Sequence, residues 1–375
     1  MAIRLNRVVR TFFPVGQGGF CVERHKIKDQ FFNLIYDCGN RGNRKPAMSI
    51  VRNAFNDNEQ IDILFISHLD TDHVSLIREL APFKNQRIVR VVLPLLQYQE
   101  QLDLFVGYTN SLWRSKDDSA DVLKILLCPE DFFKGAKIVY VRPDRDDEDA
   151  RVFSDESSTD GQYELNRRQL DRYEIVNSLQ NVRGTNDWLL LPVNVNFESL
   201  HKKLIRKIRL WLHSVGGTMS DLNDVTFVRK HIRKLRLFYK ELPGGTNGNS
   251  MTLYSGPDPN SLSQFKVRFS SKIPGCPPGC LYTGDATLTT MHLNREYRPF
   301  LKQVGIVQVP HHGAKNKFEI EYFPAAGRVC PVFYGEHNIH RHPCECVVRQ
   351  IRERRGVVVP VTDNPRTKIE QTIEW

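Results

Sequence analysis

The sequence lacks long apolar runs and CxxC cysteine pairs, and its only close cysteine spacings are Cys276 with Cys280 and Cys344 with Cys346. No stretch approaches the roughly 20 apolar residues of a transmembrane helix, and the first residues are charged, without the apolar core of a signal peptide. The eight cysteines include no CxxC pair, so we expect reduced thiols rather than a disulfide framework. No internal repeats stand out. These absences argue against a membrane channel and favour a protein of the cytoplasm.

The composition is that of a large globular protein. The chain has 375 residues, of which 40% are hydrophobic and 26% charged, so it can bury a sizeable core as one domain or as one domain with an insertion. Lys and Arg outnumber Asp and Glu, which gives a formal net charge of +10. An excess of this sign favours a polyanionic partner if it gathers on one face.

The strongest chemical signal is the segment 68–73, HLDTDH, which directly follows the apolar run 61–66. A strand that ends in this segment would aim imidazoles and carboxylates at one point, and these are ligands for Zn²⁺, Mn²⁺ or Fe. Alternatively, an Asp here only caps a helix that begins near Asp72. A cap accounts for one Asp, whereas four liganding groups in six residues favour a metal site.

Two further segments place metal-capable side chains just past a predicted strand. Residues 281–285 form a short apolar run that stops at Gly284-Asp285, and residues 304–310 form another that ends in His311-His312-Gly313. Alone, a Gly-Asp pair is ordinary turn chemistry. The ends of these two predicted strands and segment 68–73 together predict one shared metal site.

Seven segments together resemble the metallo-β-lactamase superfamily, in the branch similar to the hydrolase domain of the DNA-uptake competence protein ComEC. In chain order they are FPVGQGGF (13–20), LIYDCG (34–39), HLDTDH (68–73), NSMTL (249–253), YTGDA (282–286), VPHHGAKN (309–316) and RHP (341–343). They reach both ends of the chain, but most of residues 82–243 contain no segment that resembles the family. The general superfamily motif is HxHxDH, and Asp70 stands where its second His would be. Gly19 and Ala314 also depart from the branch.

The resemblance implies an α/β fold, a metallo-β-lactamase αββα sandwich with a basic helical insertion. Its two halves would be residues 1–97 and 244–375, with the insertion across 98–243 and the metals at one edge between the sheets. Three expected strands follow the same plan: 89–94, 137–141 and 188–193. Residues 143–162 are acidic and Ser-rich, so we expect an exposed loop inside the insertion.

The resemblance also implies a ligand set. His68, Asp70 and Asp285 would hold one ion, and Asp72, His73, His311 and the shared Asp285 the second. No His within 82–243 fits the superfamily's third motif, because His201, His213 and His231 lie in basic helical sequence. The number of bound ions, one or two, therefore remains open. The candidate ions are Zn²⁺ and Mn²⁺, with Mg²⁺ also possible, and the oxygen ligand Asp70 favours Mn²⁺ or Mg²⁺.

Four residues have implied roles beside the ions. Asp72 resembles the residue that orients the attacking water, and His342 could donate a proton to the leaving oxygen or bind the scissile phosphate. The alternative for His342 is a histidine fixed in a turn by Pro343. His312 and Lys315 are expected in an outer shell or against substrate phosphate.

The excess positive charge gathers between residues 200 and 242. HKKLIRKIRLWLH and FVRKHIRKLRLFYKEL alternate basic and apolar residues at helical spacing, on either side of Gly216-Gly217. The pattern predicts an amphipathic helical hairpin whose basic face suits nucleic acid; a solvated face or an anionic membrane surface are the alternatives. The expected nucleic-acid contacts are Lys202, Lys203, Arg206, Lys207, Arg229, Lys230, Arg233 and Lys234.

Three function hypotheses remain. The first is a metal-dependent phosphodiesterase or nuclease acting on DNA by metal-activated water. The second is a hydrolase of a small nucleotide or ester, because fold and site do not fix the substrate. The third is a non-catalytic metal-binding regulatory module, against which the intact ligand set speaks. Protein partners, oligomeric state and mode of cleavage are not predicted.

Overall fold

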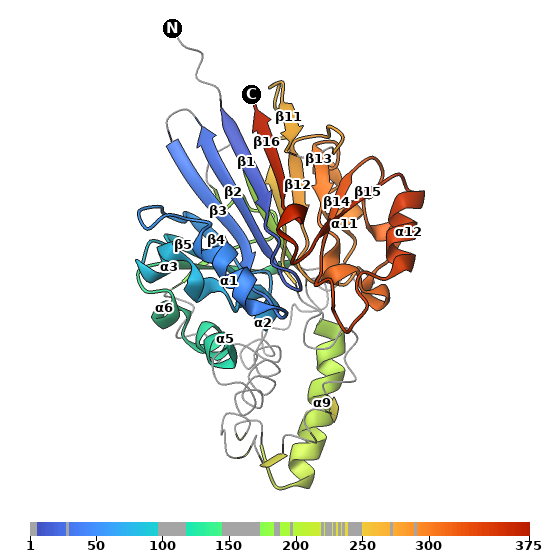
Figure 1. Cartoon of the computed structure of the whole chain (residues 1–375). Helices are drawn as coiled ribbons and strands as arrows, with labels where there is room; N and C mark the ends of the chain where they lie inside the picture. Colours follow the sequence, from blue (N-terminus) through green and yellow to red (C-terminus); the bar gives the residue numbers. More distant parts are fainter. Residues whose placement is uncertain are drawn as a thin grey trace.

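The structure is a computed structural model that describes residues 6–27, 30–96, 118–144, 173–183, 188–195, 198–218, 250–270, 273–288 and 291–375. It also describes the single positions 221, 227, 230, 231, 234, 237 and 238. The fold is α/β, with two mixed sheets and several helices (Figure 1).

The larger sheet has nine strands in the order β11-β16-β1-β2-β3-β4-β5-β6-β8. Its antiparallel part joins the two ends of the described chain, because β1 pairs with β16 as well as with β2. From β3 onward the pairs are parallel. The strands are β1 (Arg7–Phe12), β2 (Phe20–Ile27), β3 (Gln30–Cys38), β4 (Ile63–Phe65), β5 (Arg90–Pro94), β6 (Lys137–Val141), β8 (Glu174–Val176), β11 (Lys266–Phe269) and β16 (Ile369–Glu374).

The smaller sheet has seven strands in the order β15-β14-β13-β12-β10-β9-β7. Strands β12 to β15 run parallel, whereas β10 is antiparallel to both of its neighbours. The strands are β7 (Pro143–Asp144), β9 (Leu189–Val195), β10 (Thr252–Gly256), β12 (Gly279–Tyr282), β13 (Val304–Val307), β14 (Val329–Phe333) and β15 (Val357–Val361).

Helices lie beside both sheets (Figure 1). Those near the larger sheet are α1 (Arg44–Arg52), α2 (Thr71–Val74), η1 (Ile77–Glu79), α3 (Ala81–Lys84), α5 (Asp118–Leu127) and α6 (Pro129–Phe132). Those near the smaller sheet are α11 (Leu293–Glu296), η4 (Arg298–Phe300), η5 (Pro310–Gly313), η6 (Lys315–Lys317), η7 (Ile320–Tyr322) and α12 (Glu345–Glu353). Helix η8 (Pro365–Thr367) precedes β16, and α9 (Glu198–Ser214) extends away from both sheets.

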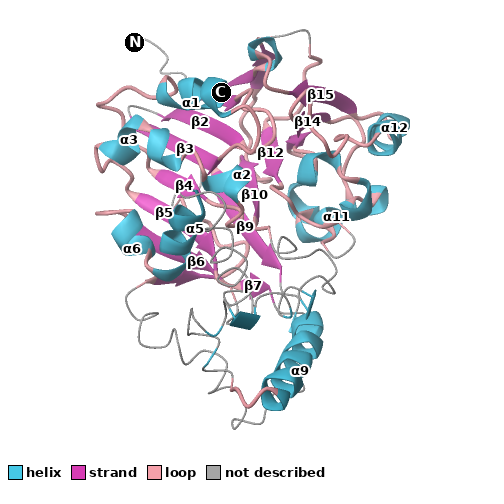
Figure 2. Cartoon of the chain, turned by 60° about the horizontal axis from the view of Figure 1, so that its bottom comes forward, coloured by secondary structure: helices cyan, strands magenta, loops and turns pink. Residues whose placement is uncertain are grey.

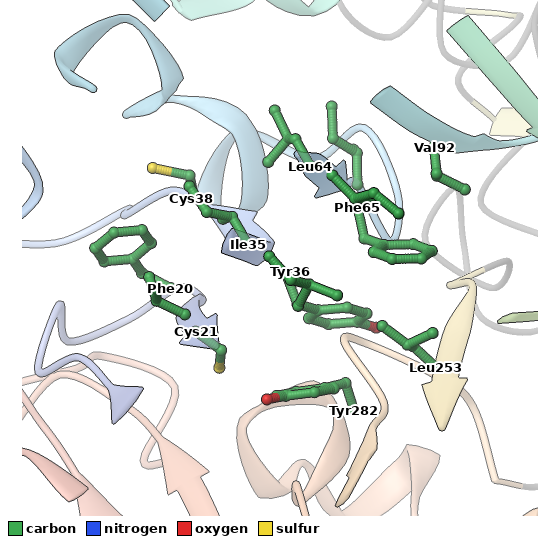
Figure 3. Packing of buried hydrophobic residues seen from close by; sticks show 14 of the residues in the cluster. Phe20, Cys21, Ile35, Tyr36, Cys38, Leu64, Phe65, Val92, Leu253 and Tyr282 are labelled. Atoms are coloured by element: carbon green, nitrogen blue, oxygen red, sulfur yellow. The ribbon is translucent and has the colours of Figure 1, made fainter. Parts of the chain in front are cut away.

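Apolar side chains from both sheets meet in one core. Tyr36 of β3 stacks on Tyr282 of β12 with ring centroids 4.9 Å apart, and Phe12 of β1 lies 6.2 Å from Phe333 of β14. Figure 3 shows Tyr36 facing Tyr282, with Leu253 of β10 beside Tyr36. Burial of this surface favours the face-to-face packing of the sheets.

A buried polar network also joins the sheets. The Arg10 guanidinium, with 0% exposure, donates to Glu23 Oε1 at 2.6 Å, to Tyr282 at 3.1 Å and to the Ser255 carbonyl at 3.2 Å. Glu23 also lies 2.9 Å from His25 Nε2 and accepts a 2.6 Å bond from the Ser255 hydroxyl. Because the charges are paired and their hydrogen-bonding groups are largely satisfied, the network fixes how the sheets face one another.

The expected strands 89–94, 137–141 and 188–193 correspond to β5, β6 and β9. Four strands lie within the range 98–243 that was expected as an insertion: β6 and β8 in the larger sheet, and β7 and β9 in the smaller one. The short strands in this range have no sequence motif that resembles the family. All but the first two residues of the acidic segment 143–162 lie outside the described residues.

Cysteine pairing differs from the sequence-based expectation in one place. Cys344 and Cys346, at the start of α12, are joined as a disulfide, while the other six cysteines are free. A C-x-C spacing is too short to suggest a disulfide framework, so sequence reasoning did not predict this pair. Of the helices that are described, none is both long and apolar enough to cross a membrane.

Candidate metal centre

Three strand ends converge on one edge of the molecule. Segment 68–73 follows β4 and forms the start of α2, Asp285 follows β12, and His311 and His312 lie on η5 just after β13. Figure 2 shows α2 between β4 of the larger sheet and β10 of the smaller one. Loops at strand ends can carry polar groups to a shared point while the strands stay paired.

A compact group forms around one oxygen of Asp285. Asp72, His73, Asp285 and His312 each offer a ligand atom, all within 4.8 Å of one another, and all four residues are buried. Asp285 Oδ1 lies 3.2 Å from His73 Nε2 and 3.8 Å from His312 Nε2. His312 Nε2 is also 3.2 Å from Asp72 Oδ2. Mixed imidazole and carboxylate ligands in this number suit one divalent ion.

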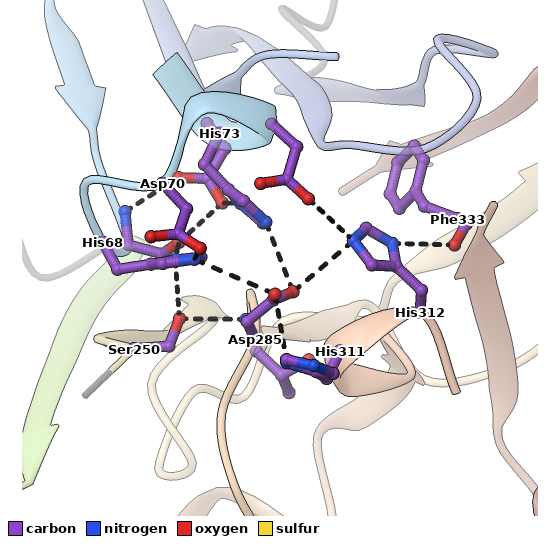
Figure 4. Close-up of polar contacts among 12 residues, drawn as sticks. His68, Asp70, His73, Ser250, Asp285, His311, His312 and Phe333 are labelled. Atoms are coloured by element: carbon purple, nitrogen blue, oxygen red, sulfur yellow. Dashed lines mark hydrogen bonds and ion pairs between the residues drawn. The ribbon is translucent and has the colours of Figure 1, made fainter. Parts of the chain in front are cut away.

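A second group gathers at the other oxygen of the same carboxylate. Asp285 Oδ2 lies 3.1 Å from His311 Nδ1 and 3.9 Å from His68 Nε2. His68 Nε2 is in turn 4.0 Å from Asp70 Oδ2. Figure 4 shows Asp285 at the centre of both groups. A carboxylate placed in this way can bridge two cations.

Outer hydrogen bonds orient three of the histidines. His73 Nδ1 donates to Asp37 Oδ2 at 2.7 Å, and His312 Nδ1 donates to the Phe333 carbonyl at 2.9 Å. The Ser67 hydroxyl donates to Asp37 Oδ2 at 2.8 Å, so it accepts from His68 Nδ1 at 2.9 Å. In each case Nδ1 carries a proton, and Nε2 faces Asp285. Partners of this kind fix the tautomer of metal-binding histidines.

Two glycines allow close approaches within the site, Gly39 to α2 and Gly284 to Ser250. A Cβ on Gly39 would lie 2.4 Å from the Asp72 carbonyl carbon and 2.5 Å from the His73 nitrogen, which is too close for any side chain. Gly284, with φ +49°, would place a Cβ 2.4 Å from the Ser250 hydroxyl. That hydroxyl accepts the Asp285 backbone N–H at 3.0 Å. These glycines therefore belong to the construction of the site.

The histidines of η5 have unusual backbone angles. His311 and His312 have φ values of +48° and +55°, in the left-handed region that non-glycine residues rarely occupy. Such conformations cost of order 1–3 kcal/mol each and persist where the surrounding structure determines them. This turn lets both rings face Asp285, His311 toward Oδ2 and His312 toward Oδ1.

Electrostatics in the site follow from burial and opposed charges. Burial lowers the pKa of His73, but the carboxylates of Asp37 and Asp285 raise it to well above its ordinary value. For His68, burial and the positive charge of His73 lower the pKa to about 4. Burial raises the pKa of Asp72, yet its bond to His312 and the His73 charge lower it to about 2. The carboxylates are thus ionised and His68 is neutral near pH 7, whereas the neighbouring carboxylates raise the pKa of His73 and His312, so a metal ion would compete with protons at these two histidines.

The donor set fits a divalent cation. His68 Nε2, His73 Nε2, His311 Nδ1 and Asp285 Oδ1 are all buried and make no hydrogen bond of acceptable geometry. Each faces other ligand atoms at 3.1–4.0 Å. Buried polar groups without partners are costly, and a cation among them would satisfy all four. The cluster can therefore bind a divalent metal ion.

The structure brings the expected ligands together but assigns His312 differently. His68, Asp70, Asp72, His73, Asp285 and His311 all lie around the site. His312 belongs to the compact group with Asp72 and His73, whereas His311 faces the side of His68. The left-handed turn determines which of these two adjacent histidines faces which group of ligands. Their order in the sequence does not predict this.

The other expected residues lie farther out. The ring of His342 is 6.2 Å from that of His312 and 6.4 Å from that of His311, beside the ligands. Burial and the charges of its neighbouring histidines lower the pKa of His342 to about 4. Lys315 is exposed. Sequence reasoning assigned no role to Asp37, Ser67 or Ser250, although Asp37 lies in the family-like segment 34–39.

The basic hairpin is described in part. Arg206 and Lys207 of α9 are exposed, as are Lys230 and Lys234, which are helical positions. The ring centroid of Trp211 in α9 lies 6.5 Å from that of Phe227 and 5.9 Å from that of Phe238. Helix α9 therefore packs against the helical positions 227 and 238, as a helical hairpin requires. The side chains of Lys202 and Lys203 lie outside the described part of the chain, as do residues Arg229 and Arg233.

Comparisons with known proteins add little beyond the site itself. No family model matches the chain, and no curated protein matches it. Among solved structures, unliganded yeast PDE1 is similar with 9% sequence identity and a TM-score of 0.37, covering 97% of this chain and 99% of that one. The ComEC-like resemblance of the sequence is not established by these comparisons.

Proposed function

We propose that the protein is a metal-dependent hydrolase, specifically a phosphodiesterase that cleaves nucleic acid, with DNA as the first candidate substrate. The fold would then be the αββα sandwich of the metallo-β-lactamase superfamily. The observation that carries the proposal is the Asp285 carboxylate, whose two oxygens face two separate sets of histidines, three of which present a buried ring nitrogen without a hydrogen bond: His68, His73 and His311. A purely structural cluster would have its hydrogen bonds satisfied.

The residues divide into two candidate ion sites. Asp72, His73, His312 and Asp285 Oδ1 would hold one ion, and His68, Asp70, His311 and Asp285 Oδ2 the other. Zn²⁺ and Mn²⁺ both suit the ligands, and Mg²⁺ is compatible with the carboxylates. A bound ion would polarise a phosphoryl oxygen and lower the pKa of water enough to make hydroxide available near neutral pH.

The protein's own groups would supply the remaining steps. Asp72, ionised at neutral pH, can accept a hydrogen bond from the attacking water and orient it. His342 is neutral near pH 7 because its pKa is about 4, so its N–H is better suited to binding the scissile phosphate than to protonating the leaving oxygen. His342 Nδ1 is buried without a partner, which leaves it available for that contact.

Nucleic acid is favoured over a small substrate by the exposed basic side chains of the hairpin. Arg206, Lys207, Lys230 and Lys234 are all exposed, and α9 extends outward from the body formed by the two sheets (Figure 1). Cations along a helix bind a phosphate backbone through release of counterions, without regard to base sequence. A long polyanion could contact both the hairpin and the metal centre.

The test is an assay of purified protein with Mn²⁺, Mg²⁺ or Zn²⁺ against linear, circular and single-stranded DNA, and against a chromogenic phosphodiester. We expect cleavage of both substrate types, abolished by chelation and by Asp72→Asn, and retained by Asp57→Asn on the exposed surface. Cleavage of the chromogenic compound alone would support the small-substrate hydrolase. Metal binding without any hydrolysis would support a regulatory module.

A further inference from the structure

Lys317 lies between two of the loops that build the metal centre. It ends η6, which directly follows the η5 turn carrying His311 and His312. Its backbone N–H bonds to the Ala314 carbonyl at 3.3 Å, and its own carbonyl accepts the Leu288 N–H at 2.8 Å. Leu288 follows closely on Asp285, so the backbone of Lys317 joins the η5 side of the site to the Asp285 side.

The ammonium group of Lys317 is shielded and has no partner. Its Nζ is buried from solvent and makes no hydrogen bond, and among the described residues no carboxylate lies within ion-pair distance of it. Removing an ammonium from water without compensation is costly. Folded proteins keep such a group where it has a function or where a ligand completes it.

The nearest relevant charge is already engaged. Burial lowers the pKa of Lys317, and the Asp285 carboxylate acts in the opposite direction, with the pKa remaining below its ordinary value. The Lys317 ammonium makes no hydrogen bond to Asp285. Both oxygens of Asp285 face histidines, so this carboxylate does not neutralise Lys317.

Lys315 provides a direct contrast on the same short helix. It is exposed, and a solvated ammonium needs no partner. The sequence analysis expected Lys315, not Lys317, in an outer shell or against substrate phosphate. The structure instead buries the ammonium group two positions later.

We propose that Lys317 forms a phosphate-binding subsite beside the metal centre, where its ammonium group receives a non-bridging oxygen of the substrate phosphate. The proposal rests on the proposed function as a phosphodiesterase and adds the residue that recognises the phosphoryl group. A lysine ammonium is a compact charge with three donors and makes charge-assisted bonds to phosphate oxygens. It would recognise the phosphate diester, not the sugar or the base.

The first test compares Lys317→Met and Lys317→Arg with Lys315→Met as the matched control. Without substrate, Lys317→Met should raise the melting temperature, because it removes a buried unpaired charge and keeps the stem. With a chromogenic phosphodiester it should lower kcat/KM about 10- to 100-fold, which corresponds to one charged hydrogen bond. Lys317→Arg should recover part of the rate, and Lys315→Met should change neither quantity.

The second test does not require turnover. Inorganic phosphate is titrated into the metal-loaded protein by calorimetry, after metal content has been matched between variants. We expect wild type and Lys315→Met to bind alike and Lys317→Met to bind about 10- to 100-fold more weakly. If wild type hydrolyses no phosphodiester, the proposed function fails, and this titration still decides the subsite.

Two outcomes would overturn the subsite. Equal phosphate affinity of wild type and Lys317→Met would show that the metal centre alone binds the anion. A lower melting temperature or lower metal content in Lys317→Met would make the lysine a structural support of the ligand loops.

Discussion

At the residue scale, one carboxylate organises the site. Asp285 faces His73 and His312 through Oδ1, and His68 and His311 through Oδ2. Its pKa is well below the ordinary value, because the positive charges of the surrounding histidines outweigh the effect of burial. A carboxylate that stays ionised in a buried position is what a shared cation ligand requires.

This geometry predicts how metal content divides between the two groups. His312→Ala and His73→Ala should each remove the ion of the compact group, and His68→Ala the ion of the other, whereas Asp285→Ala should remove both. Elemental analysis of the purified variants measures the stoichiometry. If His312→Ala retained full metal while His311→Ala lost the ion held by His73, the assignment of the two histidines would be reversed.

The buried network of Arg10, Glu23 and His25 predicts sensitivity of the fold to acid. Burial raises the pKa of Glu23, but Arg10 and His25 lower it to well below its ordinary value. Burial lowers the pKa of His25 despite its bond to Glu23. Both groups bind protons more readily when unfolded, so their stabilisation is present above the unfolded pKa values and is lost as pH falls.

We therefore expect the free energy of unfolding to decrease from about pH 6.5 downward, first through His25 and then, below about pH 4.5, through Glu23. Urea unfolding at a series of pH values measures it. In His25→Gln the decrease between pH 6.5 and 4.5 should become smaller. An unchanged profile in that variant would mean that other groups cause the decrease.

At the scale of elements, strand ends and glycines position the ligands. Helix α2 carries Asp72 and His73, and its backbone packs directly on Gly39 at the end of β3. The parallel pairs β3–β4 and β12–β13 set the strand ends from which the ligands project. A change in this packing moves two ligands together.

Gly39→Ala should therefore reduce metal binding although position 39 contributes no ligand. The added Cβ would lie 2.4 Å from the Asp72 carbonyl carbon, and relieving this overlap requires α2 to shift, at a cost of roughly 1–3 kcal/mol in stability. Gly42→Ala is the control, because its nearest neighbour would be 3.7 Å away. Metal titration and thermal unfolding of both variants decide the matter; equal behaviour would contradict the proposed packing of α2.

The positions of the strand ends and of the metal-capable side chains that follow them could be predicted from the sequence. Short apolar runs followed by HLDTDH, Gly284-Asp285 and His311-His312 located the strand ends and the ligand side chains. What could not be predicted is how backbone turns aim adjacent groups: the left-handed η5 turn gives His312 to the compact group, and η6 buries the Lys317 ammonium while exposing Lys315. Asp37 was likewise invisible as a partner of His73, because its contact depends on tertiary packing.

At the scale of the whole molecule, two sheets form the frame and α9 extends beyond it (Figure 1). Residues 98–243 had no family wording, and sequence patterns offered no reason to place β6 and β8 in one sheet and β7 and β9 in the other. Long-range pairing of short strands is set by the complete core rather than by local preference. The basic hairpin, in contrast, was evident from composition and helical spacing alone.

Charge reversal tests the hairpin as a nucleic-acid interface. Changing Arg206, Lys207, Lys230 and Lys234 to Glu should weaken DNA binding and reduce the slope of log K against log salt by about 0.7–0.9 for each phosphate that the protein no longer neutralises. Metal content and hydrolysis of a small phosphodiester should stay the same. Reversal of exposed Arg349 and Arg352 on α12 serves as control. An unchanged affinity and slope would remove the hairpin from the path of the substrate.

Turnover by a hydrolytic metal centre organised by Asp285 depends on the bound ion, and metal reconstitution measures that dependence. Wild type and Asp285→Asn are stripped with a chelator and returned to Mn²⁺ or Zn²⁺, and hydrolysis of a chromogenic phosphodiester is measured together with bound metal. We predict that metal restores turnover only in wild type, with Mn²⁺ supporting at least as much activity as Zn²⁺ because of the oxygen ligands. Turnover by the stripped wild type, or equal turnover by both reconstituted proteins, would contradict this claim.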